Sequence, residues 1–165
     1  MYEKSIELLN KALQDELAAV HQYMYFHFHC DDQGFDILAG LFKRTAIDEM
    51  LHMEILAERI LFLKGSIDMY AAEDIQPIHD VHDMLEKAAD MEMSSIKDYN
   101  KWANVCAAEA DSASKKIFEE LVLDEERHYN QWDDELDNLK RFGKDYLALQ
   151  SIERSRNRIS STTAD

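Results

Sequence analysis

The sequence has few residues that bend or cross-link a chain. Its 165 residues include one proline, four glycines and two cysteines. Because glycine and proline mark most turns, the chain has few places to turn. Two cysteines are too few for the disulfide framework of a small secreted protein, which agrees with a reducing compartment.

The sequence also lacks long apolar runs and a surplus of basic residues. No stretch reaches the roughly 18 apolar residues of a membrane span, and charged residues occur throughout the first turns, so we expect neither a membrane anchor nor a secretory signal. The cytoplasm is then the expected location. Lysine and arginine total 18 against 34 aspartates and glutamates, which gives a formal net charge of -16. This balance argues against nucleic-acid binding, which needs a basic stripe, and points toward cations.

Helical periodicity is present over long stretches. With 46% hydrophobic residues, the chain suits one domain with a sizeable core. Apolar residues recur every three or four positions from about residue 4 to 30, and a second helix is expected from about 35 to 64, stopping at Gly65. Residues 66–79, with Pro77, suit a crossover that carries the chain back along a bundle.

The second half has the same organisation. A third helix is expected from Asp80, an N-cap residue, to about residue 109, and a fourth from about 112 to 142. We expect Gly143 to end the fourth helix with a left-handed C-cap. Residues 145–153 predict a short fifth helix, and residues 155–165 a disordered tail.

Four carboxylates and two histidines occur as two copies of one pattern. In each copy a lone glutamate precedes a Glu-x-x-His pair by 33 residues, and every member of the second copy follows its counterpart by 76 residues. The six residues are Glu16, Glu49 and His52 in the first copy, and Glu92, Glu125 and His128 in the second. The same shift relates three further pairs: Tyr23 and Tyr99, Cys30 and Cys106, and Asp48 and Asp124. The chain is therefore predicted to contain two related helical hairpins.

This pattern predicts a dinuclear metal site. Glu-x-x-His places a carboxylate and an imidazole on one helix face. A glutamate from each of two helices, with Glu-x-x-His from each of the other two, is the ligand set of a dinuclear carboxylate site in a four-helix bundle. Two carboxylates 4 Å apart repel by roughly 4 kcal/mol at an effective dielectric constant of 20, so a buried cluster needs cations. Mixed nitrogen and oxygen ligands suit Fe(II), Mn(II) or Zn(II).

Three stretches of the sequence resemble those of bacterioferritin, the haem-containing ferritin of bacteria. They are residues 15–23 (DELAAVHQY), 47–52 (IDEMLH) and 124–128 (DEERH). The likeness covers nearly the whole chain and includes residues 58–60 and 143–147. It implies an all-α fold: a ferritin-like four-helix bundle over residues 1–154, with the long crossover between helices two and three and the short fifth helix.

The resemblance also implies a function. The six repeated residues would bind two irons in a ferroxidase centre, with Glu49 and Glu125 bridging them, where dioxygen or hydrogen peroxide oxidises Fe(II). Twenty-four copies, built from twofold dimers, would form a hollow shell that stores ferric mineral. A ferredoxin-type protein is the expected electron donor for iron release.

Met50 and Tyr23 take further roles from the resemblance. One residue past Glu49, Met50 is turned about 100° around the helix and must leave the metal face. In this family the methionine ligates a haem shared between two subunits, which would carry electrons inward to release iron. Tyr23 matches a tyrosine near the di-iron site and is a candidate accessory residue. Tyr99 is expected to be a core tyrosine with a satisfied hydroxyl.

Cys30 and Cys106 are expected to remain unpaired. Each lies 14 residues past its lone glutamate, about 21 Å along its helix. The symmetry of the two hairpins would send these two positions in opposite directions, which is incompatible with disulfide geometry.

Other functions remain open at this point. A DNA-protecting mini-ferritin shares its iron site between subunits and would not need this complete set within one chain. A rubrerythrin-like peroxidase carries an additional rubredoxin-like site with four cysteines, whereas this chain has two. A simpler, non-storing di-iron or di-manganese oxidase is the remaining alternative.

Overall fold

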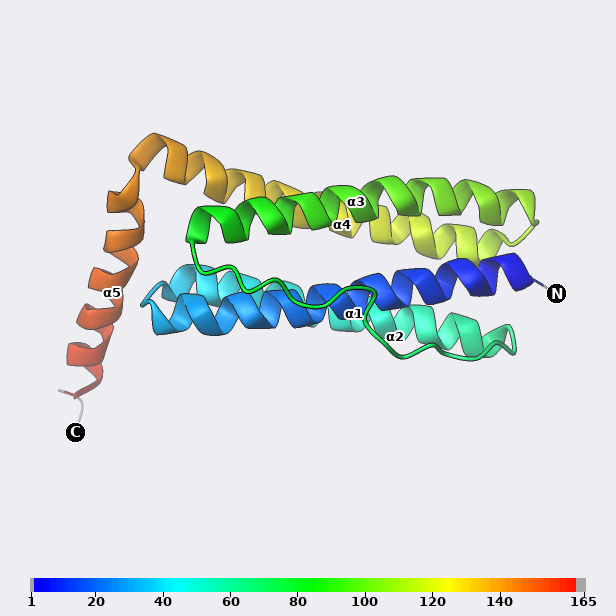
Figure 1. The fold of residues 1–165 in the computed structure, drawn as a ribbon, viewed down its shortest axis with the longest axis horizontal. Helices are drawn as coiled ribbons and strands as arrows, with labels where there is room; N and C mark the ends of the chain where they lie inside the picture. Colours follow the sequence, from blue (N-terminus) through cyan, green and yellow to red (C-terminus); the bar gives the residue numbers. More distant parts are fainter. Residues whose placement is uncertain (1, 163–165) are drawn as a thin grey trace.

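Five helices account for most of the chain. The structure, a computed structural model, describes residues 2–162, and its helices are α1 (Glu3–Asp32), α2 (Asp36–Phe62), α3 (Val81–Ala108), α4 (Ser112–Phe142) and α5 (Lys144–Thr162). Helices α1 to α4 form a bundle and α5 crosses its end (Figure 1). The predicted all-α bundle is confirmed, and the four long helices end within two residues of their predicted bounds. Over the described residues, no helix combines the length and the apolar composition that a membrane span requires.

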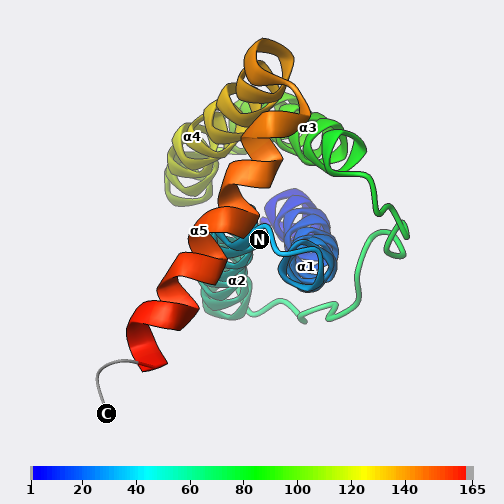
Figure 2. The same cartoon turned by 90° about the vertical axis from the view of Figure 1, so that its left-hand side faces the viewer.

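The four long helices form two hairpins that lie side by side. Helix α1 pairs with α2, and α3 with α4, while the hairpins meet where α1 packs on α3 and α2 packs on α4. The order around the bundle axis is therefore α1, α2, α4, α3 (Figure 2). The groove between α1 and α3 thus lies opposite the groove between α2 and α4.

The crossover, residues 63–80, runs along the outside of the bundle beside α1 (Figure 1). Side chains of α1 hold it in place. Asn10 Oδ1 accepts a hydrogen bond from the Asp68 amide at 2.9 Å, and Gln22 Oε1 accepts one from the Gln76 amide at 2.7 Å. The crossover returns the chain along the bundle, as predicted, so that α3 starts near the end of α1.

The interior contains two apolar clusters, one toward each end of the bundle. The first includes Leu9, Leu13, Leu56, Ile60 and Phe118, and the second includes Phe26, Leu38, Phe42, Met84 and Trp132. Cys106 is buried in the first cluster and Cys30 in the second, and both are free thiols. The prediction that the two cysteines stay unpaired is therefore confirmed.

Helix α2 ends at Phe62, close to the predicted stop at Gly65. Lys64, between the two, has a left-handed φ of 64°. The Gly65 amide donates to the carbonyl of Ile60 at 2.9 Å and closes the helix. A Cβ on Gly65 would lie 2.7 Å from Cγ2 of Ile6 and 3.0 Å from Cγ2 of Ile60. The absence of a side chain at this position therefore lets the crossover pass close to α1.

The predicted fifth helix is present, but three details of the C-terminal region differ from the prediction. Helix α5 runs to Thr162, so it is longer than the predicted 145–153, and residues 155–162 are helical rather than disordered. The remainder of the predicted tail, residues 163–165, lies outside the described residues. Gly143 has the expected positive φ of 61°, but its ψ of -152° is not that of a left-handed helical cap. The chain instead turns directly from α4 into α5.

A contact with the first hairpin shows why local sequence patterns do not predict the full length of α5. Arg154 Nη1 donates to the main-chain oxygen of Asp31 at 2.5 Å, and its Nε lies 3.3 Å from Asp36 Oδ1. These contacts join positions more than a hundred residues apart, so they fix the helix through tertiary packing rather than through propensity.

Replacing Gly65 with alanine should destabilise the bundle by about 1–3 kcal/mol, because the new methyl group would overlap with Ile6 and Ile60. Lys64→Ala is the matched control: it changes the neighbouring, exposed residue and should stay within about 0.5 kcal/mol of the parent. Urea unfolding followed by circular dichroism measures both. Equal stability of the two variants would show that the crossover tolerates a side chain at this position.

Candidate metal centre

Six polar side chains meet between the two apolar clusters. Helix α1 contributes Glu16, α2 contributes Glu49 and His52, α3 contributes Glu92, and α4 contributes Glu125 and His128. None of the six is more than 3% exposed. The structure therefore brings together all six residues that the repeated pattern singles out.

The six side chains form two overlapping groups. One group contains Glu16 and His52, the other contains Glu92 and His128, and both include Glu49 and Glu125. Within each group, one ligand atom from every residue lies within 4.8 Å of the others. Two carboxylates that belong to both groups are what a pair of metal ions with bridging ligands needs.

The polar atoms at the centre lack ordinary partners. His52 Nδ1 lies 2.9 Å from Glu49 Oε2 and 3.2 Å from Glu125 Oε1, yet neither contact has hydrogen-bond geometry. Both carboxylate oxygens of Glu49 are also buried without a hydrogen-bond partner. Unsatisfied polar atoms are costly inside a protein. Their convergence on one point fits a cation ligated by these atoms, so the residues present suit a metal site.

Burial and mutual repulsion shift the pKa values of the cluster. Burial, followed by the charges of Glu16 and Glu92, raises the pKa of Glu49 to about 7. Burial opposes a charge on His128, but its contacts with Glu125 and Glu49 outweigh that effect and raise its pKa to about 11. The pKa of His52 is raised in the same way. In the absence of metal, protons therefore compensate the buried carboxylates.

Two tyrosines hold the glutamates that are not shared. The Tyr23 hydroxyl donates to Glu92 Oε1 at 2.5 Å, and Trp132 Nε1 donates to the same oxygen at 3.0 Å. The Tyr99 hydroxyl donates to Glu16 Oε1 at 2.5 Å. Burial raises the pKa of both phenols well above its usual value, so both remain protonated donors. Tyr99 is a buried tyrosine with a satisfied hydroxyl, as expected, but its partner makes it part of the site.

Two aspartates that were not predicted as site residues contact the outer nitrogens of the histidines. Asp124 Oδ2 lies 3.2 Å from His52 Nε2, and Asp48 Oδ2 lies 3.1 Å from His128 Nε2. A carboxylate only accepts hydrogen bonds, so each Nε2 is the donor and each Nδ1 faces the glutamates. The available signal was the 76-residue shift, which places an aspartate immediately before each shared glutamate. Trp132 gave no such signal, because its counterpart in the first copy is Leu56.

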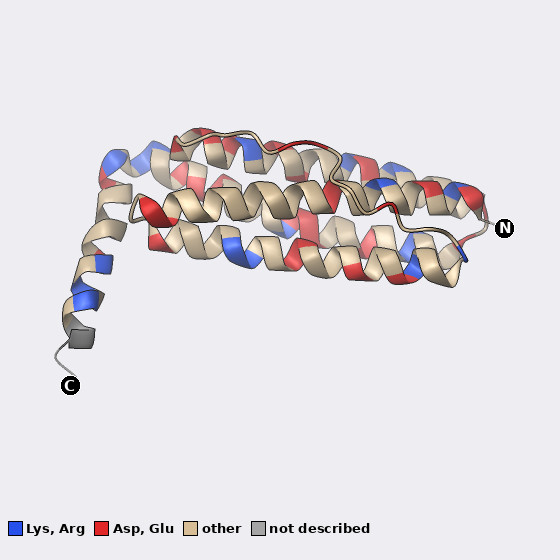
Figure 3. Cartoon of the chain, turned by 60° about the horizontal axis from the view of Figure 1, so that its bottom comes forward, with Lys and Arg blue, Asp and Glu red and all other residues tan. Residues whose placement is uncertain are grey.

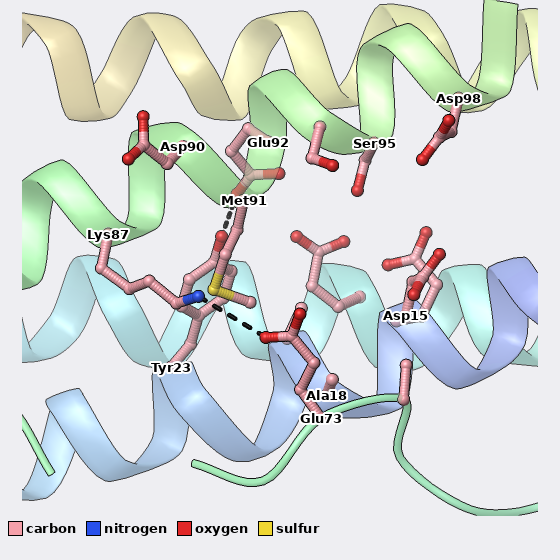
Figure 4. A pocket seen from close by; sticks show the side chains of 15 residues that line it. Asp15, Ala18, Tyr23, Glu73, Lys87, Asp90, Met91, Glu92, Ser95 and Asp98 are labelled. Carbon is pink, nitrogen blue, oxygen red and sulfur yellow. Dashed lines mark hydrogen bonds and ion pairs between the residues drawn. The ribbon is translucent and has the colours of Figure 1, made fainter. Parts of the chain in front are cut away.

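An acidic cavity of about 370 Å³ adjoins the site on the side of α1 and α3. Glu16, Glu49 and Glu92 form part of its wall, so it reaches the metal centre. Its other acidic residues are Asp15, Glu73, Asp90 and Asp98, and the amine of Lys87 lies 3.6 Å from Glu73 (Figure 4). Burial, together with nearby carboxylates, raises the pKa of Asp15 to about 7. The cavity therefore combines solvent access with a strong attraction for cations.

Met50 lies away from this centre. Its side chain is 48% exposed, whereas Glu49 beside it is 1% exposed. Ile47, Leu51 and Ile55 are also exposed, each by 44–45%. This agrees with the expectation that Met50 leaves the metal face, and its role as a haem ligand stays a prediction.

The fold and the site together define a class of protein. Two helices that each give one glutamate, and two that each give Glu-x-x-His, form the interior of the dinuclear carboxylate proteins with four-helix bundles. The known members of this class bind their metal ions inside the bundle, which is where the six side chains meet here.

Comparison with known proteins identifies the family. Residues 6–142 match the family model of the ferritin-like domain. Bacterioferritin from Desulfovibrio desulfuricans is 36% identical over 145 residues, covering 88% of this chain and 81% of that protein. Bacterioferritin from Brucella melitensis is 32% identical over 142 residues, covering 86% and 88%. The chain belongs to the ferritin family and, within it, to the bacterioferritins.

A solved structure supports the same relationship. The X-ray structure of the Desulfovibrio desulfuricans bacterioferritin, which describes that protein's diiron site in different catalytic states, matches this chain with a TM-score of 0.88 and 35% identity. The match covers 90% of this chain and 86% of the other. The bundle and the fifth helix are thus those of a known bacterioferritin.

The metal-free protein should lose stability as the pH rises from about 5 to 8. The folded cluster keeps protons that the unfolded chain releases above the usual pKa values, 4.5 for Glu49 and 6.5 for the histidines. Each retained proton lowers the free energy of unfolding by about 1.4 kcal/mol per pH unit. Carboxylates with lowered pKa values, such as Glu7 and Asp111, change the stability only below about pH 4.5, outside this window.

Thermal unfolding of chelator-treated protein across this pH range tests the prediction. The Co(II)-loaded protein is the control, because metal ions replace the retained protons and bind more tightly as the pH rises. A metal-free protein whose melting temperature is constant or rises over this range would contradict the assignment.

Proposed function

We propose that this protein oxidises Fe(II) at the six-residue centre and stores the product as ferric mineral. The observation that supports this function best is the pair of overlapping ligand groups that share Glu49 and Glu125 within one buried site. The bacterioferritin relatives, one of them with a recorded diiron site, support the choice of iron. The acidic cavity beside the centre supplies a path that attracts divalent cations.

The reaction takes two electrons from the site. Two Fe(II) ions bind as substrate, and each gives up one electron. With two protons, these electrons reduce dioxygen to hydrogen peroxide, or hydrogen peroxide to two water molecules. Carboxylates are hard ligands that favour Fe(III), so the oxidised ions are stabilised by the glutamates that bound the reduced ones.

Each ligand has a distinct task in this proposal. Glu49 and Glu125 bridge the two ions and keep them close enough to deliver electrons together. Glu16 with His52, and Glu92 with His128, each hold one ion. Tyr23 and Tyr99 fix the orientation of the unshared glutamates through their hydroxyl groups, and Tyr23 is the candidate accessory residue in the redox step.

Storage requires a cavity that one bundle does not supply, and we infer a shell of twenty-four copies built from twofold dimers. The exposed apolar residues on the outer face of α2 support a contact between two copies. In this dimer, Met50 from each copy would hold one shared haem. When bound, the haem would supply electron transfer from a ferredoxin-type donor for the release of iron in the cytoplasm.

Two features weigh against the other functions. All six ligands come from one chain, unlike the shared site of a DNA-protecting mini-ferritin. The two cysteines lie in separate apolar clusters, which does not suit the four-cysteine site of a rubrerythrin-like peroxidase. A non-storing di-iron oxidase is distinguished by how much iron the protein retains.

Glu125→Ala should slow Fe(II) oxidation by about a hundredfold or more, because it removes a ligand shared by both ions. Glu16→Ala removes an unshared ligand and should also abolish the fast phase. Glu120→Ala is the matched control: this residue lies on the exposed face of α4 and pairs with Lys116. Stopped-flow absorbance after aerobic Fe(II) addition measures the rates. Oxidation at the parent rate in Glu125→Ala would remove the site assignment.

Gel filtration after aerobic iron loading tests storage and haem binding together. The protein should elute as a particle far larger than one subunit, with many more irons per chain than two and with haem absorbance on the same peak. Met50→Leu should abolish the haem absorbance and leave the particle intact, whereas Met69→Leu, an exposed methionine in the crossover, should change neither. About two irons per chain in a small species would indicate a non-storing oxidase, and haem retained by Met50→Leu would exclude that ligand.

A further inference from the structure

The two faces of the candidate metal centre differ in how far their carboxylates are compensated by a cationic side chain. On the side of α1 and α3, the acidic cavity opens beneath the crossover and contains seven carboxylates and one lysine among its lining residues. On the opposite side, in the groove between α2 and α4, two aspartates and one arginine cover the histidines. The arginine, Arg127, has no part in the function proposed above.

Arg127 joins the two aspartates that contact the histidines. Its Nη2 donates to Asp124 Oδ1 at 3.2 Å and to Asp48 Oδ2 at 3.4 Å, and its Nη1 donates to the same Asp48 oxygen at 3.5 Å. Asp124 and Asp48 in turn contact the Nε2 atoms of His52 and His128. These five side chains form a continuous row across the groove from one imidazole to the other, and we call this row the clamp.

We propose that the clamp closes the α2–α4 face of the centre to metal ions, so that they enter and leave through the acidic cavity between α1 and α3. This inference rests on the proposed metal site. Arg127 is then a positioning residue: it acts on the metal ions through Asp48, Asp124 and the two histidines, without touching the ions itself.

The charge at each face supports this assignment. In the α2–α4 groove the guanidinium of Arg127 pairs with both Asp48 and Asp124, so a cation that binds these carboxylates must compete with it. A cation in the cavity meets Asp15, Glu73 and Asp98, with only Lys87 to oppose them. Removing the guanidinium would leave Asp48 and Asp124 with only the imidazoles of His128 and His52 as partners, which would convert a closed face into a second acidic entrance.

The clamp also constrains the imidazoles. Each ring is held at Nε2 by an aspartate and presents Nδ1 to the glutamates, and the aspartates are themselves held by one guanidinium. Residues that hydrogen-bond to metal ligands and orient them commonly lower the metal affinity by about 10- to 100-fold when they are removed. Arg127 is one step further away, so its effect should be smaller.

Co(II) bound by the full-length protein is the probe. Arg127→Gln removes the charge from the clamp, and Co(II) should then leave the protein for excess chelator about three- to tenfold faster, by analogy with exposed ion pairs. Arg141→Gln is the matched control, because Arg141 is also an exposed arginine of α4 and pairs with Asp137. Arg127→Lys keeps the charge and should restore most of the slow release. The visible absorption of bound Co(II) should change in Arg127→Gln and not in Arg141→Gln.

A second variant tests the route. Asp98→Asn weakens the attraction in the cavity and should slow Co(II) uptake by the parent chain. In the Arg127→Gln background the same change should have a smaller effect, because the second entrance bypasses the cavity. This comparison depends on rates within folded protein, so circular dichroism first confirms that each variant is folded.

The outcomes separate this inference from the proposed function. If Arg127→Gln releases Co(II) at the parent rate, or if Asp98→Asn slows uptake equally in both backgrounds, the clamp does not control access. If the parent itself fails to bind Co(II) at about two ions per chain, the metal site is wrong and the inference falls with it.

Discussion

The repulsion among four buried carboxylates is the constraint on which the rest of this structure depends. Glu16, Glu49, Glu92 and Glu125 occupy the interior of a bundle whose other buried residues are mainly apolar. In the metal-free protein, burial and neighbouring carboxylates raise the pKa values of Glu49 and Glu92, and contacts with glutamates raise the pKa of His128, so these groups keep protons that offset part of this charge. In the function proposed above, metal ions would take the place of those protons. The folded state and the metal site are therefore coupled through the same six side chains.

Each hairpin donates hydrogen bonds to a buried carboxylate of the other hairpin, and these bonds stabilise the charge. Tyr23 of the first hairpin donates to Glu92 of the second, and Tyr99 of the second donates to Glu16 of the first. The aspartates follow the same rule, since each contacts a histidine of the other hairpin. Neither hairpin alone can hold its ligands in place. Docking of the two hairpins therefore supplies each half of the site with contacts that its own hairpin lacks.

The sequence predicted the features that follow from periodicity. Apolar spacing gave the four long helices, and the 76-residue repeat identified the six central residues. Local sequence patterns did not predict features that depend on contacts between distant segments. The close approach of Gly65 to Ile6 requires the packed position of α1, and the length of α5 depends in part on Arg154 reaching Asp31 and Asp36.

The 76-residue repeat does not extend to every residue around the site, as Trp132 illustrates. Trp132 donates to Glu92 and packs against Tyr23, whereas the residue 76 positions earlier is Leu56, which has no polar group. The two halves of the metal site are therefore similar in their ligands and different in what surrounds them. Glu92 receives two hydrogen bonds on one oxygen, and Glu16 receives one from Tyr99. Two ions bound here would have unequal environments.

Helix α2 presents one face to the buried cluster and another to solvent. The first face acts within one chain, whereas the second is available for contact with another copy. Glu49 and His52 face inward, and all their partners in the centre come from the same chain. Met50 faces outward among exposed apolar residues. The haem site proposed above would need the Met50 of a second copy. Metal binding at the centre should therefore not depend on assembly, whereas haem binding should. A single residue step of about 100° around one helix is enough to place Glu49 and Met50, and the two roles proposed for them, on different faces of the same helix.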